Sequence, residues 1–226
     1  MTSWSYDCGV PKETWLNLPD AKRERITKAA LNEFGARGFS AGSLNVIARE
    51  AGIAKGSIFQ YFEDKLDLFD TVCEAGSTAI AEATIGAVDT NVPFFDLLHD
   101  LVVTWTAYFR ARPNDQRWAF AAANEIEPAA RRAVRSVANL HYEKAFRPVV
   151  EQAIARGELR DDADPDLVIS MTVLVLRHLN SAPFDPVGDP AISFVDMTDA
   201  DVDDLALEYV SLLERAFGPS WVRRGQ

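Results

Sequence analysis

The side chains that most often carry enzyme or metal chemistry are few in this chain. The sequence contains three His and two Cys, and it has no GxSxG, HExxH, CxxC, P-loop or GxGxxG pattern. His99, His141 and His178 have no nearby Cys or carboxylate arrangement typical of a catalytic triad or a metal site. The sequence therefore predicts no catalytic residues, no metal and no cofactor.

Charge is distributed unevenly along the 226 residues. The whole chain has a formal net charge of −11, yet residues 21–62 hold seven basic and three acidic side chains. Residues 71–226 hold 14 basic and 24 acidic side chains. A small basic unit thus precedes a larger acidic one, which favours a nucleic-acid partner for the first unit only weakly.

Residues 39–65, FSAGSLNVIAREAGIAKGSIFQYFEDK, form the most informative segment. The pattern predicts a helix, a three-residue turn around Gly52 and a short second helix, because glycine tolerates the positive φ of a tight turn. Ala48 is small where two crossing helices would touch. A compact core would come from Val46, Ile47, Ile53, Ile58 and Phe62. This spacing matches a helix-turn-helix, and a generic helical hairpin fits it equally well.

The elements around this segment are also predicted to be helices. Asn17 and Asp20 form a capping pattern for a helix that Gly38 ends. Strand is an alternative for 165–181, although its length favours helix, and 183–197 is predicted to be a loop. The other expected helices cover 43–50, 54–61, 64–84, 93–110, 114–123, 128–156 and 199–217. Ser43 is expected to cap the first of them, Gly157 to end the helix over 128–156, and Thr198 and Asp201 to cap the last.

The stretch from about Lys22 to Phe69 closely resembles the DNA-binding domain of the TetR family of transcriptional regulators. The residues that carry the resemblance are Arg25-Ile26, Ala29-Ala30, Phe34, Gly38-Phe39, Ile47-Ala48, Ala51-Gly52-Ile53, Lys55-Gly56-Ser57, Phe59, Tyr61-Phe62, Lys65 and Leu68-Phe69. The resemblance implies an all-α fold, with an N-terminal three-helix helix-turn-helix DNA-binding domain and a larger helical ligand-binding and dimerisation domain. The expected divisions are an aromatic extension at 1–19, the DNA-binding domain at 20–63 and the second domain at 64–226. The extension would pack on the first helix, and contact with the minor groove of DNA is the less favoured alternative.

The resemblance also implies which residues meet DNA. Lys55 would open the recognition helix in the major groove, and Gly56 would let the backbone approach the DNA closely. The remaining expected contacts, to phosphates or base edges, are Ser43, Ser57, Gln60, Tyr61 and Lys65.

Two positions depart from the family pattern. Ala54 provides no hydroxyl cap, and Phe59 lacks a frequent tyrosine hydroxyl, so Phe59 is expected in the core or against a sugar.

The resemblance further implies a homodimer formed through 165–181 and 199–217, a palindromic operator and a small-molecule effector bound in the second domain. Aromatic and polar side chains on its central helices suit a largely apolar or aromatic effector. The candidate pocket residues are Trp105, Tyr108, Phe109, Trp118, Glu125, Tyr142, Phe146, Met171 and His178. Glu125 would meet a cationic group of the effector, and a solvated carboxylate is the alternative. Packing in the core is the alternative for every aromatic.

The sequence thus predicts a ligand-responsive transcriptional regulator, most simply a repressor, that is not an enzyme. A helical small-molecule-binding protein or enzyme with an incidental helix-turn-helix is the alternative. A redox switch formed by Cys8 and Cys73 is a further alternative. No apolar run is long enough to span a membrane, and residues 1–13 lack the pattern of a signal peptide, so a cytoplasmic protein without a membrane partner is expected.

Overall fold

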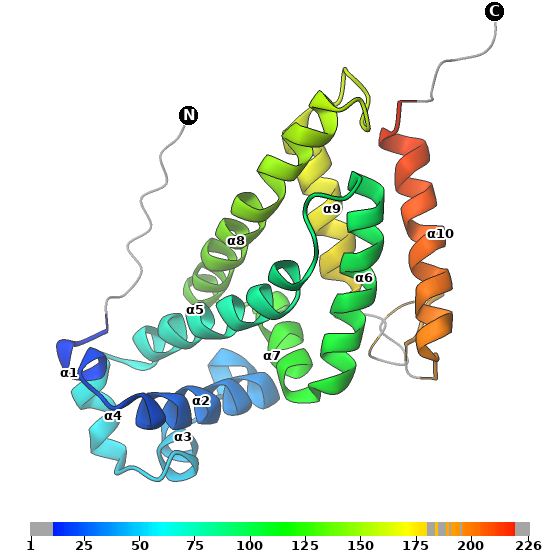
Figure 1. The fold of residues 1–226 in the computed structure, drawn as a ribbon. Coiled ribbons are helices and arrows are strands. Elements are labelled where there is room, and N and C mark those ends of the chain that lie inside the picture. The colour runs from blue at the N-terminus through cyan, green and yellow to red at the C-terminus, as the bar shows by residue number, and fades with distance from the viewer. Residues whose placement is uncertain (1–10, 180–183, 185–188, 190, 195, 220–226) are drawn as a thin grey trace, which may run out of the picture. The chain divides into compact units, whose positions relative to one another are not determined.

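The computed structural model describes residues 11–179, 184, 189, 191–194 and 196–219. Within these residues every regular element is a helix, as Figure 1 shows. The elements are α1 (Glu13–Leu16), α2 (Asp20–Ala41), α3 (Leu44–Glu50), α4 (Lys55–Tyr61), α5 (Lys65–Ala83), the 3-10 helix η1 (Ile85–Ala87), α6 (Phe94–Ala111), α7 (Pro113–Ala123), α8 (Pro128–Ala155), α9 (Pro165–Leu179) and α10 (Asp199–Phe217).

The all-α prediction is confirmed, and residues 165–179 form a helix rather than a strand. The predicted helix breakers are confirmed as well: Gly38, Gly52 and Gly157 adopt φ of 68°, 66° and 71°. The backbone of α2 is non-helical at Gly38, after which one more short turn leads to α3. Residues 183, 185–188, 190 and 195 of the predicted loop 183–197 lie outside the described residues.

Two predicted caps were wrong in detail. Asn17 does not cap α2; its own N–H donates to the Glu13 and Trp15 carbonyls, so it ends α1 instead. Ser43 lies at the N-cap position of α3, but its hydroxyl makes no capping bond. The carboxylate of Glu33 accepts the Ser43 N–H at 3.0 Å.

The chain divides into two compact units, residues 1–80 with 113–139 and residues 81–112 with 140–226. Unit 1 therefore combines α1 to α4 and most of α5 with α7 and the first part of α8. Unit 2 contains η1, α6, the rest of α8, α9 and α10. The boundary expected between residues 63 and 64 separates a DNA-binding domain from an effector-binding domain. The two compact units do not test this division by function, so it stays a prediction.

The interior of unit 1 is aromatic and closely packed. Phe69 lies edge-on to Phe34 and Trp118, with ring centroids 5.0 and 5.7 Å away. Gly35 and Gly76 allow this packing, because a Cβ at Gly35 would lie 3.1 Å from the Trp118 backbone and one at Gly76 would lie 2.8 Å from the Trp118 indole nitrogen. α7 therefore lies against α2 at close range and also contacts α5 through Trp118.

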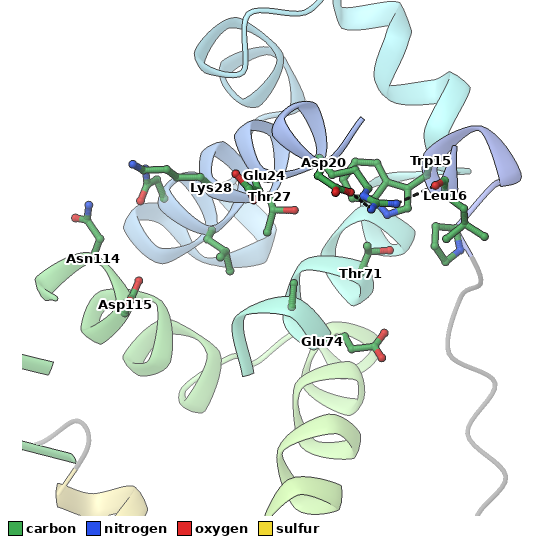
Figure 2. Close-up of a pocket in the computed structure, with 15 residues that line it drawn as sticks. Trp15, Leu16, Asp20, Glu24, Thr27, Lys28, Thr71, Glu74, Asn114 and Asp115 are labelled. Carbon is green, nitrogen blue, oxygen red and sulfur yellow. Dashed lines mark hydrogen bonds and ion pairs between the residues drawn. The ribbon is translucent and has the colours of Figure 1, made fainter. Parts of the chain in front are cut away.

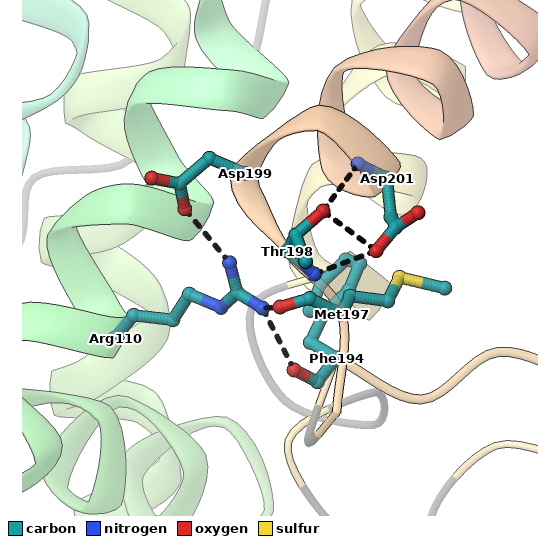
Figure 3. A network of polar contacts seen from close by, with 6 residues as sticks. All are labelled: Arg110, Phe194, Met197, Thr198, Asp199 and Asp201. Carbon is teal, nitrogen blue, oxygen red and sulfur yellow. Dashed lines mark hydrogen bonds and ion pairs between the residues drawn. The ribbon is translucent and has the colours of Figure 1, made fainter.

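Unit 2 is built around α6, which packs against α9 and α10. Figure 3 shows how Arg110, near the end of α6, reaches the start of α10. Its guanidinium donates to Asp199 at 3.0 Å and to the Phe194 carbonyl at 3.1 Å, and it also donates to the Met197 carbonyl. The predicted Thr198–Asp201 capping box is confirmed beside it. These bonds fix where α10 begins.

Candidate nucleic-acid interface and effector region

The segment from α3 to α4 folds as two short helices joined by a tight turn. The left-handed φ of 66° at Gly52 reverses the chain after α3, and the Ile53 N–H donates back to the Ala48 carbonyl at 2.9 Å. The interior of this pair consists of the buried side chains of Ile47, Ala48, Ala51, Ile58 and Phe62. The helix-turn-helix geometry predicted from the sequence is therefore present.

One face of α4 is directed to solvent. Lys55, Gly56 and Gln60 are exposed on it, and Ser57 is half-buried. Phe59 is 46% exposed, so its interpretation as a core residue is wrong. A short helix carrying one cation, one amide and one glycine on its open face has the dimensions and donors to read a DNA major groove.

Tyr61 is held at the end of α4 by contacts on two sides. Its ring is buried against Trp15, with centroids 6.3 Å apart. Its hydroxyl oxygen accepts a hydrogen bond from Lys22 Nζ at 2.9 Å. Because that oxygen accepts, its own proton remains to be donated, which is the role a phosphate contact requires.

Lys65 opens α5, where the Asp64 carboxylate caps the N–H groups of Leu66 and Asp67. The Lys65 ammonium donates to the Ser40 carbonyl at 3.0 Å and lies 4.7 Å from the centroid of the Phe39 ring. An ammonium has three donors. Lys65 thus holds the chain just ahead of α3 in place and keeps donors for an anion. Ser43, three residues after Ser40, lies half-buried at the start of α3.

The carbonyl end of α4 is covered by residues that the sequence analysis did not identify. Lys12 Nζ donates to the carbonyls of Phe59 at 3.0 Å and Phe62 at 3.3 Å, and the Lys12 N–H donates to Tyr61 at 3.1 Å. Thr14 Oγ1 donates to the Gln60 carbonyl. One cation and two further donors at a helix C-terminus satisfy its open carbonyls and complement its dipole. The described part of the extension therefore packs on α4 through Lys12 and Thr14, and its Trp15 also contacts Phe62.

Two of the predicted pocket residues, Trp118 and Glu125, lie in unit 1. Trp118 is buried against Phe69. Glu125 is also buried, and its carboxylate accepts three main-chain hydrogen bonds, from Phe39 at 3.0 Å, Ile126 at 3.0 Å and Glu127 at 2.9 Å. Both oxygens of Glu125 are thus engaged within the unit. Whether either residue contributes to an effector site stays a prediction.

The other aromatic candidates gather in unit 2. Trp105, Tyr108 and Phe109 are buried on α6, and Phe146 is buried on α8. Tyr142 stacks between two of them, with ring centroids 6.3 Å from Trp105 and 6.3 Å from Phe146. Five of the nine predicted pocket residues therefore lie in one aromatic group.

Met171 and His178 are placed differently. Met171 is exposed on α9. His178 is exposed near the end of the same helix, and its ring contacts the carboxylate of Asp189. The bonds from the Ala191 and Ile192 N–H groups, with a smaller contribution from His178, hold the pKa of Asp189 below its usual value. The assignment of Met171 and His178 to a pocket stays a prediction.

Unit 1 also has an open cavity of about 810 Å³ that no sequence pattern indicated. Figure 2 shows its wall of α2 residues, with Asn114 and Asp115 of α7 at one end and Trp15 and Leu16 of α1 at the other. Its remaining lining residues are Pro11, Asp20, Arg23, Glu24, Thr27, Lys28, Leu31, Asn32, Thr71, Glu74 and Ala75. Acidic and basic groups alternate along it, so its chemistry indicates no particular ligand.

Neither a metal centre nor a membrane span was found in the described part of the chain. No three His, Cys, Asp or Glu side chains there are grouped as metal ligands would be. None of its helices is both long and apolar enough to cross a bilayer.

Comparison with known families decides the assignment. Residues 26–72 match the family described as bacterial regulatory proteins, tetR family. Residues 95–196 match the tetracyclin repressor-like C-terminal domain. The chain belongs to the TetR family. As a TetR-family protein it combines the helix-turn-helix of unit 1 with a C-terminal region of the family's own type.

Individual relatives agree with this assignment over different lengths. The transcriptional regulator AcrR of Shigella flexneri is 40% identical over 60 residues, which is 26% of this chain and 28% of AcrR. The match thus spans about a quarter of either protein. A TetR-family transcriptional regulator from Chloroflexus aurantiacus J-10-FL has a crystal structure that is 25% identical over 92% of this chain and 99% of that one, with a TM-score of 0.62.

A third similarity concerns the fold alone. The transcriptional regulator FadR of Bacillus subtilis, whose structure contains stearoyl-CoA, has a TM-score of 0.66 at 16% identity and covers 84% of this chain and 96% of that one. The TetR fold therefore extends over both units. The predicted family and fold class are confirmed.

Proposed function

We propose that this TetR-family protein is a ligand-responsive repressor that binds a palindromic operator as a homodimer and is released by a small, largely apolar or aromatic effector. The observation that carries the DNA-binding part is the open face of α4. It presents Lys55, Gly56 and Gln60 to solvent on a helix whose other side is anchored in the core. Ser43, Ser57, Tyr61 and Lys65 are the accompanying contacts, to phosphates or bases.

A homodimer is supported by an apolar stripe in unit 2. Leu167, Met171 and Leu174 are exposed on α9 at spacings of four and three residues, which places them on one side of the helix. Leu207 and Leu212 are exposed on α10. Exposed apolar residues at helical spacing suit a bundle with a second copy of the chain. Two recognition helices fixed about 34–36 Å apart would read the two halves of a palindrome.

The effector would bind in unit 2, where Trp105, Tyr108, Phe109, Tyr142 and Phe146 form the aromatic group. The stearoyl-CoA in the FadR structure is a precedent, within the same fold, for binding a ligand with a long apolar part. DNA and effector would favour different spacings of the recognition helices, so each would weaken binding of the other. α5 runs from unit 1 into unit 2 and is the expected lever.

A fluorescence-anisotropy titration tests the proposal with DNA from upstream of the protein's own reading frame. Wild type is expected to bind with an affinity that falls steeply with salt. Lys55→Ala should weaken binding about tenfold and lower the salt slope by about one. Lys144→Ala, which removes an exposed cation from α8, is the matched control and should bind like wild type. Salt-independent binding, or equal loss in both variants, would contradict the proposal.

A further inference from the structure

Trp105 has a buried donor that nothing in the described part of the chain accepts. The side chain is 5% exposed on α6, and its indole nitrogen Nε1 has no hydrogen-bond partner there. Buried donors in native proteins are bonded in the large majority of cases, because an unbonded one loses its hydration without replacement. A donor buried in this way indicates an acceptor supplied from outside the described residues.

The surroundings of Trp105 are flat and apolar. Its ring stacks on Tyr142 at an interplanar angle of 15° and lies 6.2 Å from the ring centroid of Phe109. Tyr142 stacks in turn on Phe146 at 23°. All four side chains belong to unit 2, so the group is complete within one compact unit. Such walls suit a planar or aromatic molecule.

The carboxylate of Asp189, whose side chain is 7% exposed, is engaged with His178, and apart from it the described interior of unit 2 holds hydroxyl groups. Its buried polar side chains are Thr84, Thr106 and Thr172. Arg110, the cation closest in sequence, is engaged with Asp199 and two carbonyls. A charged group brought beside the aromatic stack would lose its water with no opposite charge to replace it. The chemistry therefore favours a neutral ligand.

We infer that the Trp105 indole N–H is the hydrogen bond donor that anchors the effector, and that the effector is a neutral aromatic compound carrying a carbonyl oxygen. The inference rests on the proposed function and adds the ligand class and the residue that selects it. The carbonyl accepts from Nε1, and the aromatic part packs against the Trp105–Tyr142–Phe146 stack. Donors held in an apolar site discriminate strongly between a ligand with an acceptor and one without.

Two probes of nearly equal shape test the inference on the full chain. 2-Acetylnaphthalene has a carbonyl oxygen, and 2-ethylnaphthalene has a methylene in its place. Calorimetric titration of wild type should show the acetyl compound binding about tenfold more tightly, the ratio expected when a buried donor is satisfied or left unsatisfied. In Trp105→Phe the two probes should bind within about twofold of each other, since the donor is gone and the aromatic surface remains.

Trp15→Phe is the matched control, because it removes the indole N–H of a buried tryptophan in unit 1 that is not among the candidate pocket residues. It should keep the wild-type preference. Equal affinity of the two probes for wild type, failure of both to bind, or a preference that survives in Trp105→Phe would each overturn the inference.

A second measurement does not depend on the folding of a variant. In wild type labelled with ¹⁵N-tryptophan, one indole N–H resonance should move downfield on addition of 2-acetylnaphthalene and stay in place with 2-ethylnaphthalene. No such difference would overturn the inference. DNA binding is measured separately: a wild type that binds DNA but does not distinguish the probes refutes this inference alone. A wild type that distinguishes the probes but binds no DNA refutes the regulatory proposal alone.

Discussion

Glu125 accepts a hydrogen bond from the main-chain N–H of Phe39, with 3.0 Å between Oε2 and N, although 86 residues separate the two. Phe39 follows directly on the break at Gly38, and its ring lies under the Lys65 ammonium. One buried carboxylate thus ties the segment after α7 to the residues that lead into α3. This bond helps to determine where the helix-turn-helix begins.

Glu125→Gln should lower the free energy of unfolding by about 1–3 kcal/mol. The amide would turn an NH₂ group toward one of the three main-chain N–H groups that the carboxylate accepts, and a buried donor would lose its partner. Urea denaturation followed by circular dichroism measures the change. Glu82→Gln, at an exposed position of α5, should stay within about 0.5 kcal/mol of wild type. Equal stability of both variants would contradict the structural role of Glu125.

Gly56→Ala separates stability from DNA binding. No atom lies within 4 Å of a Cβ built at Gly56, and its φ is not positive, so alanine should raise helix stability by about 0.5–1 kcal/mol. The same methyl group would stand between the backbone and the DNA, so affinity for the operator should fall about tenfold. Thermal melting and anisotropy on the same preparation test both halves. An affinity equal to that of wild type would contradict the proposed close approach.

Leu174→Glu tests the proposed dimer. Leu174 is 61% exposed as the last member of the α9 stripe, and a carboxylate there would be buried against the partner copy. Sedimentation equilibrium should give the dimer mass for wild type and the monomer mass for Leu174→Glu. Ile126→Glu introduces the same charge at a residue of unit 1 that is 82% exposed, and it should remain dimeric. A dimeric Leu174→Glu would place the interface elsewhere.

Asp201 gives a prediction with a defined pH dependence. The Thr198 hydroxyl, followed by the Thr198 N–H, lowers the pKa of Asp201 from its ordinary value of 3.8. Because the pKa is lower in the folded state, the ionised group stabilises the fold above pH 3.8, and that contribution disappears as pH falls through the lowered value. Wild type should therefore have a higher melting temperature than Asp201→Asn at pH 6, and the two melting temperatures should converge at low pH. A gap that widens on acidification would contradict this account of the cap.

Local features of the fold could be predicted from the sequence because they depend on neighbouring residues. The left-handed glycines at 38, 52 and 157 and the Thr198–Asp201 box each follow from backbone preferences over a few positions. Ser43 shows the limit of such reasoning. It occupies the predicted N-cap position, but its hydroxyl makes no capping bond, and its N–H donates to Glu33 on the previous helix, a contact that no local pattern signals.

Contacts between distant segments could not be predicted in this way. Hydrophobic spacing shows which face of a helix is buried, but not which partner covers it. Lys12 and Thr14 bond the end of α4 across 46 or more residues. No pattern around Lys12 in the sequence distinguishes it from a solvated lysine. The partial negative charge that it complements belongs to the carbonyl end of α4, which lies beside Lys12 only in the folded chain.

The most direct test of the central claim is a DNase I footprint of the full chain on the DNA upstream of its reading frame. The account predicts two protected half-sites of inverted sequence, with centres about one helical turn or 34–36 Å apart, and loss of both in Lys55→Ala. Protection that follows no inverted repeat, or that is unchanged in Lys55→Ala, would contradict the assignment of α4 as the recognition helix of a symmetric dimer.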